Sequence, residues 1–249
     1  MTGSGTQLTL KPWIKRYPAQ AHDAKPTLVF PHAGGAALAY RNLGMGLAAA
    51  GSDAYVMQYP QRGDRLTHPA PVTVGDLARD LFEAGDWSGV GPLRLFGHCM
   101  GAVVAFEFAR IAERRGVEIS ALWVSASEAP ATVAASPDLP TAESEIIAEM
   151  VDLGGTDPQL LADEDFVELL LMAVRADYEA FNRYACDAEV TIAADIYALG
   201  GRSDHRVSEG MLRRWEAHTD GVFTCSMFDG GHFYVNDHIA DVAELVNEF

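Results

Sequence analysis

The sequence of 249 residues predicts an α/β fold in which a mostly parallel central sheet is flanked by helices. Two observations support this prediction. Short runs rich in Val, Leu, Phe and Tyr alternate with longer segments in which apolar residues recur every three or four positions. Such alternation is typical of a parallel sheet covered on both faces. The length suits one doubly wound unit, so residues 1–249 are predicted to form a single domain.

Seven strands are expected in this sheet. The first, at 13–17, alternates apolar and basic residues and ends at Pro18, a pattern typical of an edge strand. The other six are short and mostly apolar, so each is expected to be buried on both faces. They are predicted at 27–30, 54–58, 93–96, 121–125, 195–199 and 223–228.

Helices are predicted between the strands because apolar residues recur there at helical spacing. Their expected ranges are 37–50, 74–84, 101–115, 209–218 and 239–249. Two capping signals support these boundaries. Ser208 precedes the fourth helix as a candidate N-cap, and Gly116 follows the basic last turn of the third.

One segment interrupts the alternation. From residue 131 to residue 188 the sequence is acidic and Leu-rich and contains no strand-like runs. It is interrupted by Gly154-Gly155 and Pro158. Helical stretches are expected there at 142–153, 163–172 and 173–184. We predict a helical insertion over the carboxyl edge of the sheet. It either forms a mobile lid that lines a substrate channel or is a layer that only covers the core.

The composition excludes several classes of function. Hydrophobic residues make up 49% of the chain and charged residues 21%, as in a folded globular protein. The net charge of −17 repels phosphate backbones and anionic lipids, so neither nucleic acid nor a membrane is expected as a partner. No apolar run approaches the roughly 20 residues of a membrane-spanning helix. No metal-ligand spacing or phosphate-binding loop is present, so no metal or cofactor is expected.

Cysteine usage indicates a reducing compartment. The three cysteines, Cys99, Cys186 and Cys225, form neither a C-x-x-C pair nor an even disulfide framework. The amino-terminal residues also lack a basic segment followed by an apolar signal core. A cytoplasmic location is therefore expected.

Cys99 lies in the turn with the clearest chemical signal. The predicted strand at 93–96 runs directly into Gly-His-Cys-Met-Gly at 97–101, and a long helical pattern follows. This arrangement resembles the nucleophile turn of α/β-hydrolase folds, in which glycines relieve crowding and the side chain is presented at a helix N-terminus. That position favours a thiolate. The alternative is a small buried Cys at an ordinary Gly-rich turn.

An acid and a histidine should follow the nucleophile in that order along the chain. Asp204 lies in a Gly-rich loop after the predicted strand at 195–199, where the acid is expected. Asp195 and Asp229 are alternatives, but the first lies within the strand and the second after the next one.

His232 is the expected base because it follows the last predicted strand and precedes the closing helix. It would accept the thiol proton and later activate water, while Asp204 would hold its tautomer and stabilise the imidazolium. His98 and His32 are expected to be structural.

An oxyanion hole requires two N–H donors aimed at the developing negative charge. Met100, directly after the nucleophile, is expected to supply one. The second is expected from the Gly-rich turn at 31–35, with Ala33 as the best placed residue. The alternative for this segment is an ordinary strand-to-helix turn.

Five motifs resemble those of the type II thioesterases of nonribosomal peptide and polyketide synthesis. They are PHAGG at 31–35, QYPQRGDR at 58–65, GHCMG at 97–101, GGRSD at 200–204 and GGHFY at 230–234. The resemblance extends over nearly the whole chain and includes the opening strand and the position of a lid. It implies a stand-alone editing enzyme that removes acyl groups from the phosphopantetheine arm of an acyl or peptidyl carrier protein. It also implies that Cys99, Asp204 and His232 are catalytic and that Ala33 and Met100 form the oxyanion hole.

Two residues depart from the family pattern, and two arginines follow it. The family usually has Ser in place of Cys99 and Gly in place of Gln61. Arg62 and Arg65 match the family's arginine-bearing loop, and the resemblance implies that they either steady this loop or contact the carrier protein and its pantetheine. Two exposed, solvated arginines are the alternative.

Three functions are consistent with these residues, and the first is favoured. They are a carrier-protein thioesterase that forms an acyl-enzyme on Cys99, an acyltransferase that passes the acyl group to an amine or alcohol, and a non-catalytic acyl or carrier-binding protein. The acyltransferase is considered because an acyl-thioester on Cys99 lies close in energy to a substrate thioester. A dienelactone-hydrolase-like enzyme also has Cys in this turn, but the PHAGG motif and the inserted segment favour the thioesterase. The protein is expected to be a monomer.

Overall fold

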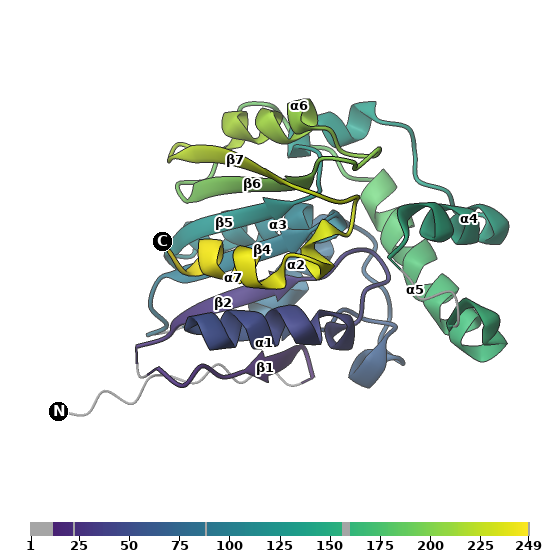
Figure 1. The fold of residues 1–249 in the computed structure, drawn as a ribbon, viewed down its shortest axis with the longest axis horizontal. Helices are drawn as coiled ribbons and strands as arrows, with labels where there is room; N and C mark the ends of the chain where they lie inside the picture. Colours follow the sequence, from purple (N-terminus) through teal and green to yellow (C-terminus); the bar gives the residue numbers. More distant parts are fainter. Residues whose placement is uncertain (1–11, 22, 88, 156–159, 249) are drawn as a thin grey trace.

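The computed structural model describes residues 12–248 apart from 22, 88 and 156–159. Seven strands form one sheet in the order β1-β3-β2-β4-β5-β6-β7 (Figure 1). The first strand, β1 (Ile14–Tyr17), pairs antiparallel with β3, and every other neighbouring pair is parallel. The predicted fold class, a mostly parallel sheet flanked by helices, is confirmed.

The six strands predicted to be apolar all form, within two residues of their expected ends. They are β2 (Lys25–Phe30), β3 (Ser52–Met57), β4 (Leu93–His98), β5 (Ile119–Ser125), β6 (Asp195–Gly201) and β7 (Phe223–Phe228). The expectation of burial on both faces is wrong for β7, whose residues are half-buried or exposed. The reason is its position, because β7 is an edge strand that pairs only with β6.

Helices cover both faces of the sheet. In Figure 1, α1 (Arg41–Ala50) and α7 (Ile239–Asn247) lie in front of it, and α2 (Val74–Glu83) and α3 (Met100–Arg114) lie behind it. The sheet therefore separates two apolar layers. The predicted end of the last helix at Phe249 lies outside the described residues. No helix in the described part of the chain is long and apolar enough to cross a bilayer.

The helix predicted at 209–218 is shorter than expected. Only α6 (Glu209–Leu212) is α-helical, and a 3₁₀ helix follows at Arg213–His218. Trp215 and His218 explain the change, because both are buried and lie three residues apart, a spacing that a 3₁₀ helix places on one side. The two capping predictions are confirmed. The Ser208 side chain accepts a hydrogen bond from Met211 N–H, and Gly116 adopts a left-handed φ of 76° after α3.

The segment between β5 and β6 is helical, as predicted. It contains a 3₁₀ turn (Pro130–Ala135), α4 (Glu143–Leu153), a second such turn (Leu160–Ala162) and α5 (Glu164–Asn182). The two helices expected at 163–172 and 173–184 are one continuous helix, because no Gly or Pro interrupts the junction. Pro158, which the sequence analysis named as an interruption of this segment, lies outside the described residues. In Figure 1, α4 and α5 project beyond the carboxyl ends of the strands.

Candidate active site

Cys99 occupies a strained turn between β4 and α3. It is the N-cap of α3, with φ 55° and ψ −127°, a backbone conformation that side chains rarely adopt. Its N–H donates to the carbonyl of Ser125 at 2.8 Å, and its carbonyl accepts from Ala102 N–H at 3.0 Å. These bonds hold the turn in place, so the thiol is presented at the N-terminus of a helix of 15 residues.

The glycines on either side of this turn are required by the backbone around them. A Cβ at Gly97 would lie 2.4 Å from the Gly101 carbonyl oxygen, and a Cβ at Gly101 would lie 2.1 Å from that of Phe30. Neither obstacle is a movable side chain. The Gly-x-Cys-x-Gly motif is therefore explained by close packing of α3 on β2 and β4.

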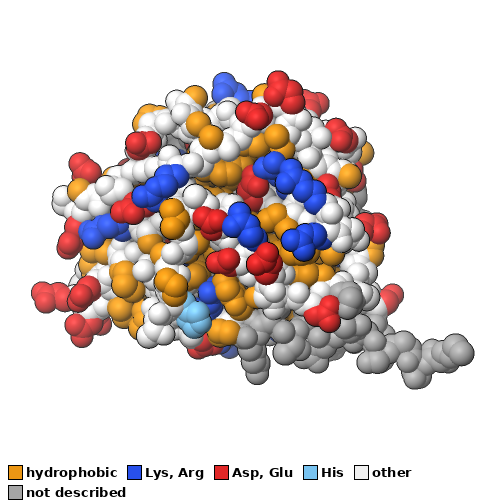
Figure 2. Space-filling model, turned by 180° about the vertical axis from the view of Figure 1, so that it is seen from behind, with side chains coloured by type: hydrophobic (Ala, Val, Ile, Leu, Met, Phe, Trp, Pro, Cys, Tyr) orange, Lys and Arg blue, Asp and Glu red, His pale blue; other side chains and the backbone are white. Residues whose placement is uncertain are grey.

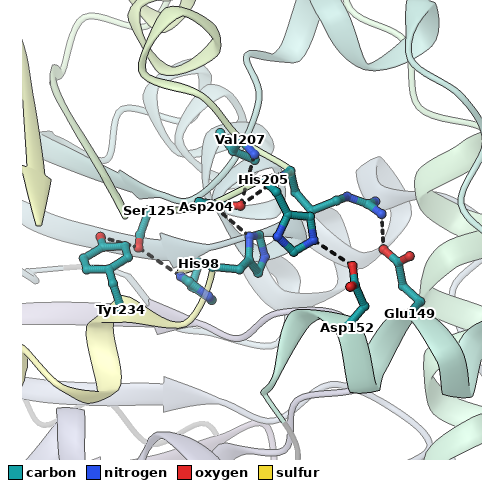
Figure 3. Close-up of polar contacts among 10 residues, drawn as sticks. His98, Ser125, Glu149, Asp152, Asp204, His205, Val207 and Tyr234 are labelled. Atoms are coloured by element: carbon teal, nitrogen blue, oxygen red, sulfur yellow. Dashed lines mark hydrogen bonds and ion pairs between the residues drawn. The ribbon is translucent and has the colours of Figure 1, made fainter. Parts of the chain in front are cut away.

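Asp204 and His232 meet at the same edge of the sheet. His232 Nδ1–H donates to Asp204 Oδ2 at 2.9 Å, and both side chains are buried. The other carboxylate oxygen accepts from the N–H groups of Arg206 (2.8 Å) and Val207 (3.1 Å) (Figure 3). Asp204 thereby fixes the ring so that Nε2, which is buried, is left to exchange a proton.

The two alternative acids are placed elsewhere. Asp229 is 91% exposed and pairs with Arg202. Asp195 lies at the start of β6, at the opposite end from the site, and accepts from Val222 N–H at 2.7 Å. Neither carboxylate makes the contact with His232 that Asp204 makes.

His232 and Cys99 line the same pocket. Burial alone would lower the pKa of His232, but the charge of the Cys99 thiolate, hydrogen bonding to Asp204 and Cys99, and the charge of Asp204 together raise this pKa to about 10. His232 is therefore protonated near pH 7. The arrangement can attack an electron-poor carbonyl carbon and can also supply a proton to a leaving group.

His98 and His32 have structural contacts, as expected. His98 is fully buried, and its Nδ1 is hydrogen-bonded to Ser125 Oγ at 2.9 Å, which in turn meets Tyr234 OH at 2.7 Å. Figure 3 shows this row of three side chains. His32 Nδ1 is hydrogen-bonded to Tyr40 OH at 2.7 Å. Burial lowers the pKa of both imidazoles, so both are neutral near pH 7.

The turn at 31–35 leaves one amide for the site. His32 N–H donates to Tyr40 OH (3.0 Å), and Gly34 N–H donates to Asp177 Oδ2 (2.7 Å). Ala33 N–H, between them, has no such partner among the described residues, and Ala33 lines the same pocket as Cys99 and His232. Met100 is the first residue of α3, so its N–H lacks an intrahelical acceptor. Ala33 lines the pocket of Cys99 and Met100 follows Cys99 directly, and their role as oxyanion donors stays a prediction.

The pocket above Cys99 is narrow and mostly apolar. Its volume is about 50 Å³, and its walls beyond the site residues come from α4, α5 and the His232 loop. The lining side chains from these elements are Met150, Leu153, Leu170, Val174, Tyr178 and Phe233. The α4–α5 segment therefore forms the roof of the site.

The two arginines of the 58–65 loop are not exposed, which corrects two expectations. Arg62 and Arg65 are 6% and 3% exposed. Arg62 donates to the carbonyls of Gly35 and Pro60 and to the Asp177 carboxylate, and Arg65 stacks on Trp13. Their guanidinium groups are therefore occupied inside the protein and cannot contact a carrier protein or its pantetheine in this conformation. Of the roles that the resemblance allowed, steadying the loop fits this burial.

The departure at Gln61 has a backbone explanation. Gln61 adopts φ 62°, in the left-handed region that Gly occupies without steric cost. The Gly that the family usually has there would suit this conformation. The loop of this chain therefore keeps the same turn with a more strained residue.

Sequence reasoning missed Asp177, the carboxylate that joins α5 to two loops of the site. It is 4% exposed, although it lies in an acidic stretch that reads as solvated. One signal was available, because Asp177 follows Val174 by three positions and precedes Tyr178, so it shares their apolar helix face. A charged residue on such a face is usually paired.

The site brings together a thiol, an imidazole and a carboxylate, and comparison with known proteins identifies the family of the chain. A model of the thioesterase domain matches residues 25–249. The chain belongs to the thioesterase family. Its fold is the α/β-hydrolase fold of that family.

Two solved structures resemble this thioesterase over nearly its whole length. BorB, a type II thioesterase from the borrelidin biosynthetic cluster, is 35% identical, with 98% of both chains covered and a TM-score of 0.82. YbtT, a type II thioesterase from the yersiniabactin NRPS/PKS pathway, is 28% identical, with 95% of this chain and 97% of that chain covered and a TM-score of 0.82. This thioesterase therefore shares its fold over nearly its whole length with type II thioesterases.

A third relative is a much larger protein. Phenyloxazoline synthase MbtB of Mycobacterium tuberculosis is 58% identical over 241 residues, which are 97% of this chain but only 17% of the synthase. The thioesterase therefore spans about a sixth of the length of this relative.

Proposed function

We propose that this thioesterase removes acyl groups from the phosphopantetheine arm of a carrier protein, through an acyl-enzyme on Cys99. One observation carries the proposal. A single pocket brings the Cys99 thiol, the His232 imidazole and the Ala33 amide together, with Asp204 behind the imidazole. These are the groups that acyl transfer through a covalent intermediate requires.

In the first half-reaction the Cys99 thiolate attacks the carbonyl carbon of the thioester. A bond forms between Sγ and that carbon, and the carbonyl electron pair moves to oxygen. The N–H groups of Ala33 and Met100 stabilise the oxyanion. As the tetrahedral intermediate collapses, the bond to the pantetheine sulfur breaks and His232 donates its proton to the leaving thiol.

In the second half-reaction water replaces pantetheine. Neutral His232 accepts a proton from water, and the oxygen attacks the acyl carbon of the Cys99 thioester. The same two amides hold the oxyanion, and the Sγ–carbon bond then breaks to release the free acid. Asp204 stabilises the imidazolium in both half-reactions.

The proposed partner is a carrier protein, and its charge must be compatible with that of this thioesterase. A carrier protein is acidic as a class, and the net charge of −17 would repel it unless the contact surface differs from the average. Figure 2 shows one face on which Lys and Arg side chains lie among Asp, Glu and hydrophobic ones, so the negative charge is not uniform. An apolar or locally basic contact for the carrier is therefore compatible with the total charge.

Two arrangements of the partner are supported. Similarity to BorB over 98% of both chains supports a stand-alone editing enzyme that visits carriers on another chain. Similarity to one part of MbtB supports an equivalent reaction on a carrier within a synthase. The chemistry at Cys99 is the same in both, and we favour the stand-alone editing role.

Cys99 itself favours a second reaction. The family usually has Ser there, and a thioester on Cys99 is nearly equal in energy to the substrate thioester. Transfer of the acyl group to an amine or alcohol is therefore the alternative to hydrolysis. A non-catalytic acyl or carrier-binding protein is the third possibility.

The test combines mass spectrometry of the intact protein with thiol release. The thioesterase and its Cys99→Ala variant are incubated with a panel of acylated carrier proteins, with and without amine and alcohol acceptors. We expect a transient acyl adduct on the parent, free acid as the product, and no adduct or thiol release with the variant. Equal thiol release by the variant would refute the proposal. Acylated acceptors as the main product would establish the transferase, and a stable adduct without turnover would establish a binding protein.

A further inference from the structure

A buried carboxylate joins the roof of the site to the oxyanion loop. Asp177 lies on α5, is 4% exposed, and accepts a hydrogen bond from Gly34 N–H at 2.7 Å. The two residues are 143 positions apart in the sequence. Val174, one turn earlier on α5, packs on the same glycine, since a Cβ at Gly34 would lie 2.3 Å from Val174 Cγ2. One face of α5 therefore clamps the turn at Gly34, which has φ 76°.

Arg62 connects the same carboxylate to the rest of this turn. Its guanidinium donates to Asp177, to the carbonyl of Gly35 at 3.2 Å and to the carbonyl of Pro60. Gln58 in turn donates to the Arg62 carbonyl at 3.1 Å. The turn is thus held from two sides by a charged pair and its hydrogen bonds.

These contacts bear on the neighbouring amide. The peptide group that Asp177 holds joins Ala33 to Gly34, and the amide before it, His32 N–H, is held by Tyr40 OH at 3.0 Å. The amides on both sides of Ala33 N–H are therefore fixed by side chains. Rotation of either flanking peptide plane would turn the Ala33 amide away from the pocket.

A purely structural role for the pair is the competing explanation. Removing two charges from water is costly, and a buried ion pair often stabilises a fold no better than apolar residues of the same size. Stability alone therefore gives little reason to place a carboxylate here. Positioning the turn gives a direct reason, because a carboxylate is a strong acceptor for a backbone N–H.

We propose that Asp177 is a positioning residue for the reaction: by holding Gly34 N–H it keeps the Ala33 amide aimed at the oxyanion. The inference rests on the proposed function, in which Ala33 is an oxyanion donor. It implies that the oxyanion hole is complete only while α5 is docked on the turn.

Two double variants separate the effect of the hydrogen-bond acceptor at position 177 from the effect of the Arg62–Asp177 ion pair. Arg62→Met/Asp177→Asn and Arg62→Met/Asp177→Leu both lack the ion pair, and their side chains at 177 have nearly the same shape. Only the Asn keeps an oxygen that Gly34 N–H can reach. With an acyl-N-acetylcysteamine thioester, we expect kcat of the Leu variant to be about 10- to 100-fold below that of the Asn variant. KM and the rate of Cys99 alkylation by iodoacetamide should agree within about twofold.

Equal kcat values in the two double variants, at equal melting temperature, would overturn the inference. Should the Leu variant not fold, the single variants Asp177→Asn and Asp177→Ser give the same comparison, because a Ser hydroxyl is too short to reach the amide. Equal kcat in that pair would also refute the inference. The Cys99→Ala control separates the two levels. Its inactivity alongside equal variants rejects only the positioning role, whereas its activity rejects the proposed function.

Discussion

Three imidazole rings lie together behind the nucleophile, and their partners decide which one carries a proton. The His98 and His232 ring centroids are 5.4 Å apart, and those of His98 and His32 are 6.1 Å apart. His232 lies near the Cys99 side chain and the Asp204 carboxylate, and these two groups raise its pKa to about 10 against the effect of burial. The other two rings are hydrogen-bonded to hydroxyl groups, so burial and the charge of His232 lower their pKa values. Of these three rings, His232 is the one that is protonated near pH 7.

The neutral state of His98 predicts a pH dependence of stability. Folded His98 does not take up a proton near pH 6, because burial first and then His232 hold its pKa well below its usual value. The unfolded chain does take one up below about pH 6.5. The unfolding free energy should therefore fall as the pH is lowered, and in His98→Asn the fall should be less steep by up to about 1.4 kcal/mol per pH unit below pH 6. Urea unfolding at pH 7, 6 and 5 measures both curves, and parallel curves would contradict the prediction.

The two helices of the roof are attached to the site in different ways. α5 is held by the buried contact of Asp177 with Gly34. α4 is held by two ion pairs, from Glu149 to Arg206 and from Asp152 to His205, whose side chains are mostly half-exposed or exposed (Figure 3). Exposed ion pairs contribute about 0–1 kcal/mol each, and Ile146 and Met150 of α4 also pack in an apolar cluster with α5.

The attachment of α4 can be loosened without touching the catalytic groups. In the variant Glu149→Gln/Asp152→Asn we expect faster amide hydrogen exchange in α4 and faster alkylation of Cys99, because both ion pairs are lost. The unfolding free energy should fall by less than about 2 kcal/mol. The matched control is the parent protein at high salt, which should approach the variant because salt screens exposed charges. Unchanged exchange and alkylation would show that α4 does not depend on these pairs.

At the scale of the whole molecule, the candidate site and the contacts that hold the last helix lie at opposite ends of the strands. Every strand before a site loop is parallel to its neighbours, so the loops after β2, β4, β6 and β7 meet at one edge. Near the opposite edge, Arg94 is 1% exposed and donates to Val246 O (2.8 Å), Ser52 Oγ (2.7 Å) and Asn247 Oδ1 (3.2 Å). This one side chain ties β4 and β3 to the end of the last helix.

Arg94 should therefore matter for stability and not for catalysis. Arg94→Met leaves acceptors on two segments, β3 and α7, without this donor, so we expect the unfolding free energy to fall by about 2–4 kcal/mol. At 25 °C the kcat of the folded variant should equal that of the parent, because the site lies at the other end of the strands. Urea unfolding and thioester hydrolysis measure the two effects. A large loss of kcat with intact folding would show that the two edges are coupled.

The sequence by itself determined the features that depend on local patterns. Strand positions follow from short apolar runs, and the triad order follows from the place of Cys99, Asp204 and His232 after successive strands. The glycines at 97 and 101 marked the nucleophile turn before any contact was known. Parallel strands bring their carboxyl ends to one edge, so this much of the site could be assembled from chain order alone.

Only the tertiary structure decided what depends on partners far apart in the chain. Arg62 and Asp177 are separated by 115 positions, and each reads as a solvated charge until the other is placed beside it. The half-burial of β7 and the 3₁₀ turn at Trp215 likewise depend on what packs against them. A residue's burial is a property of its neighbours in space. Periodicity predicts which face of an element is apolar, and long-range packing decides which charged groups that face must also enclose.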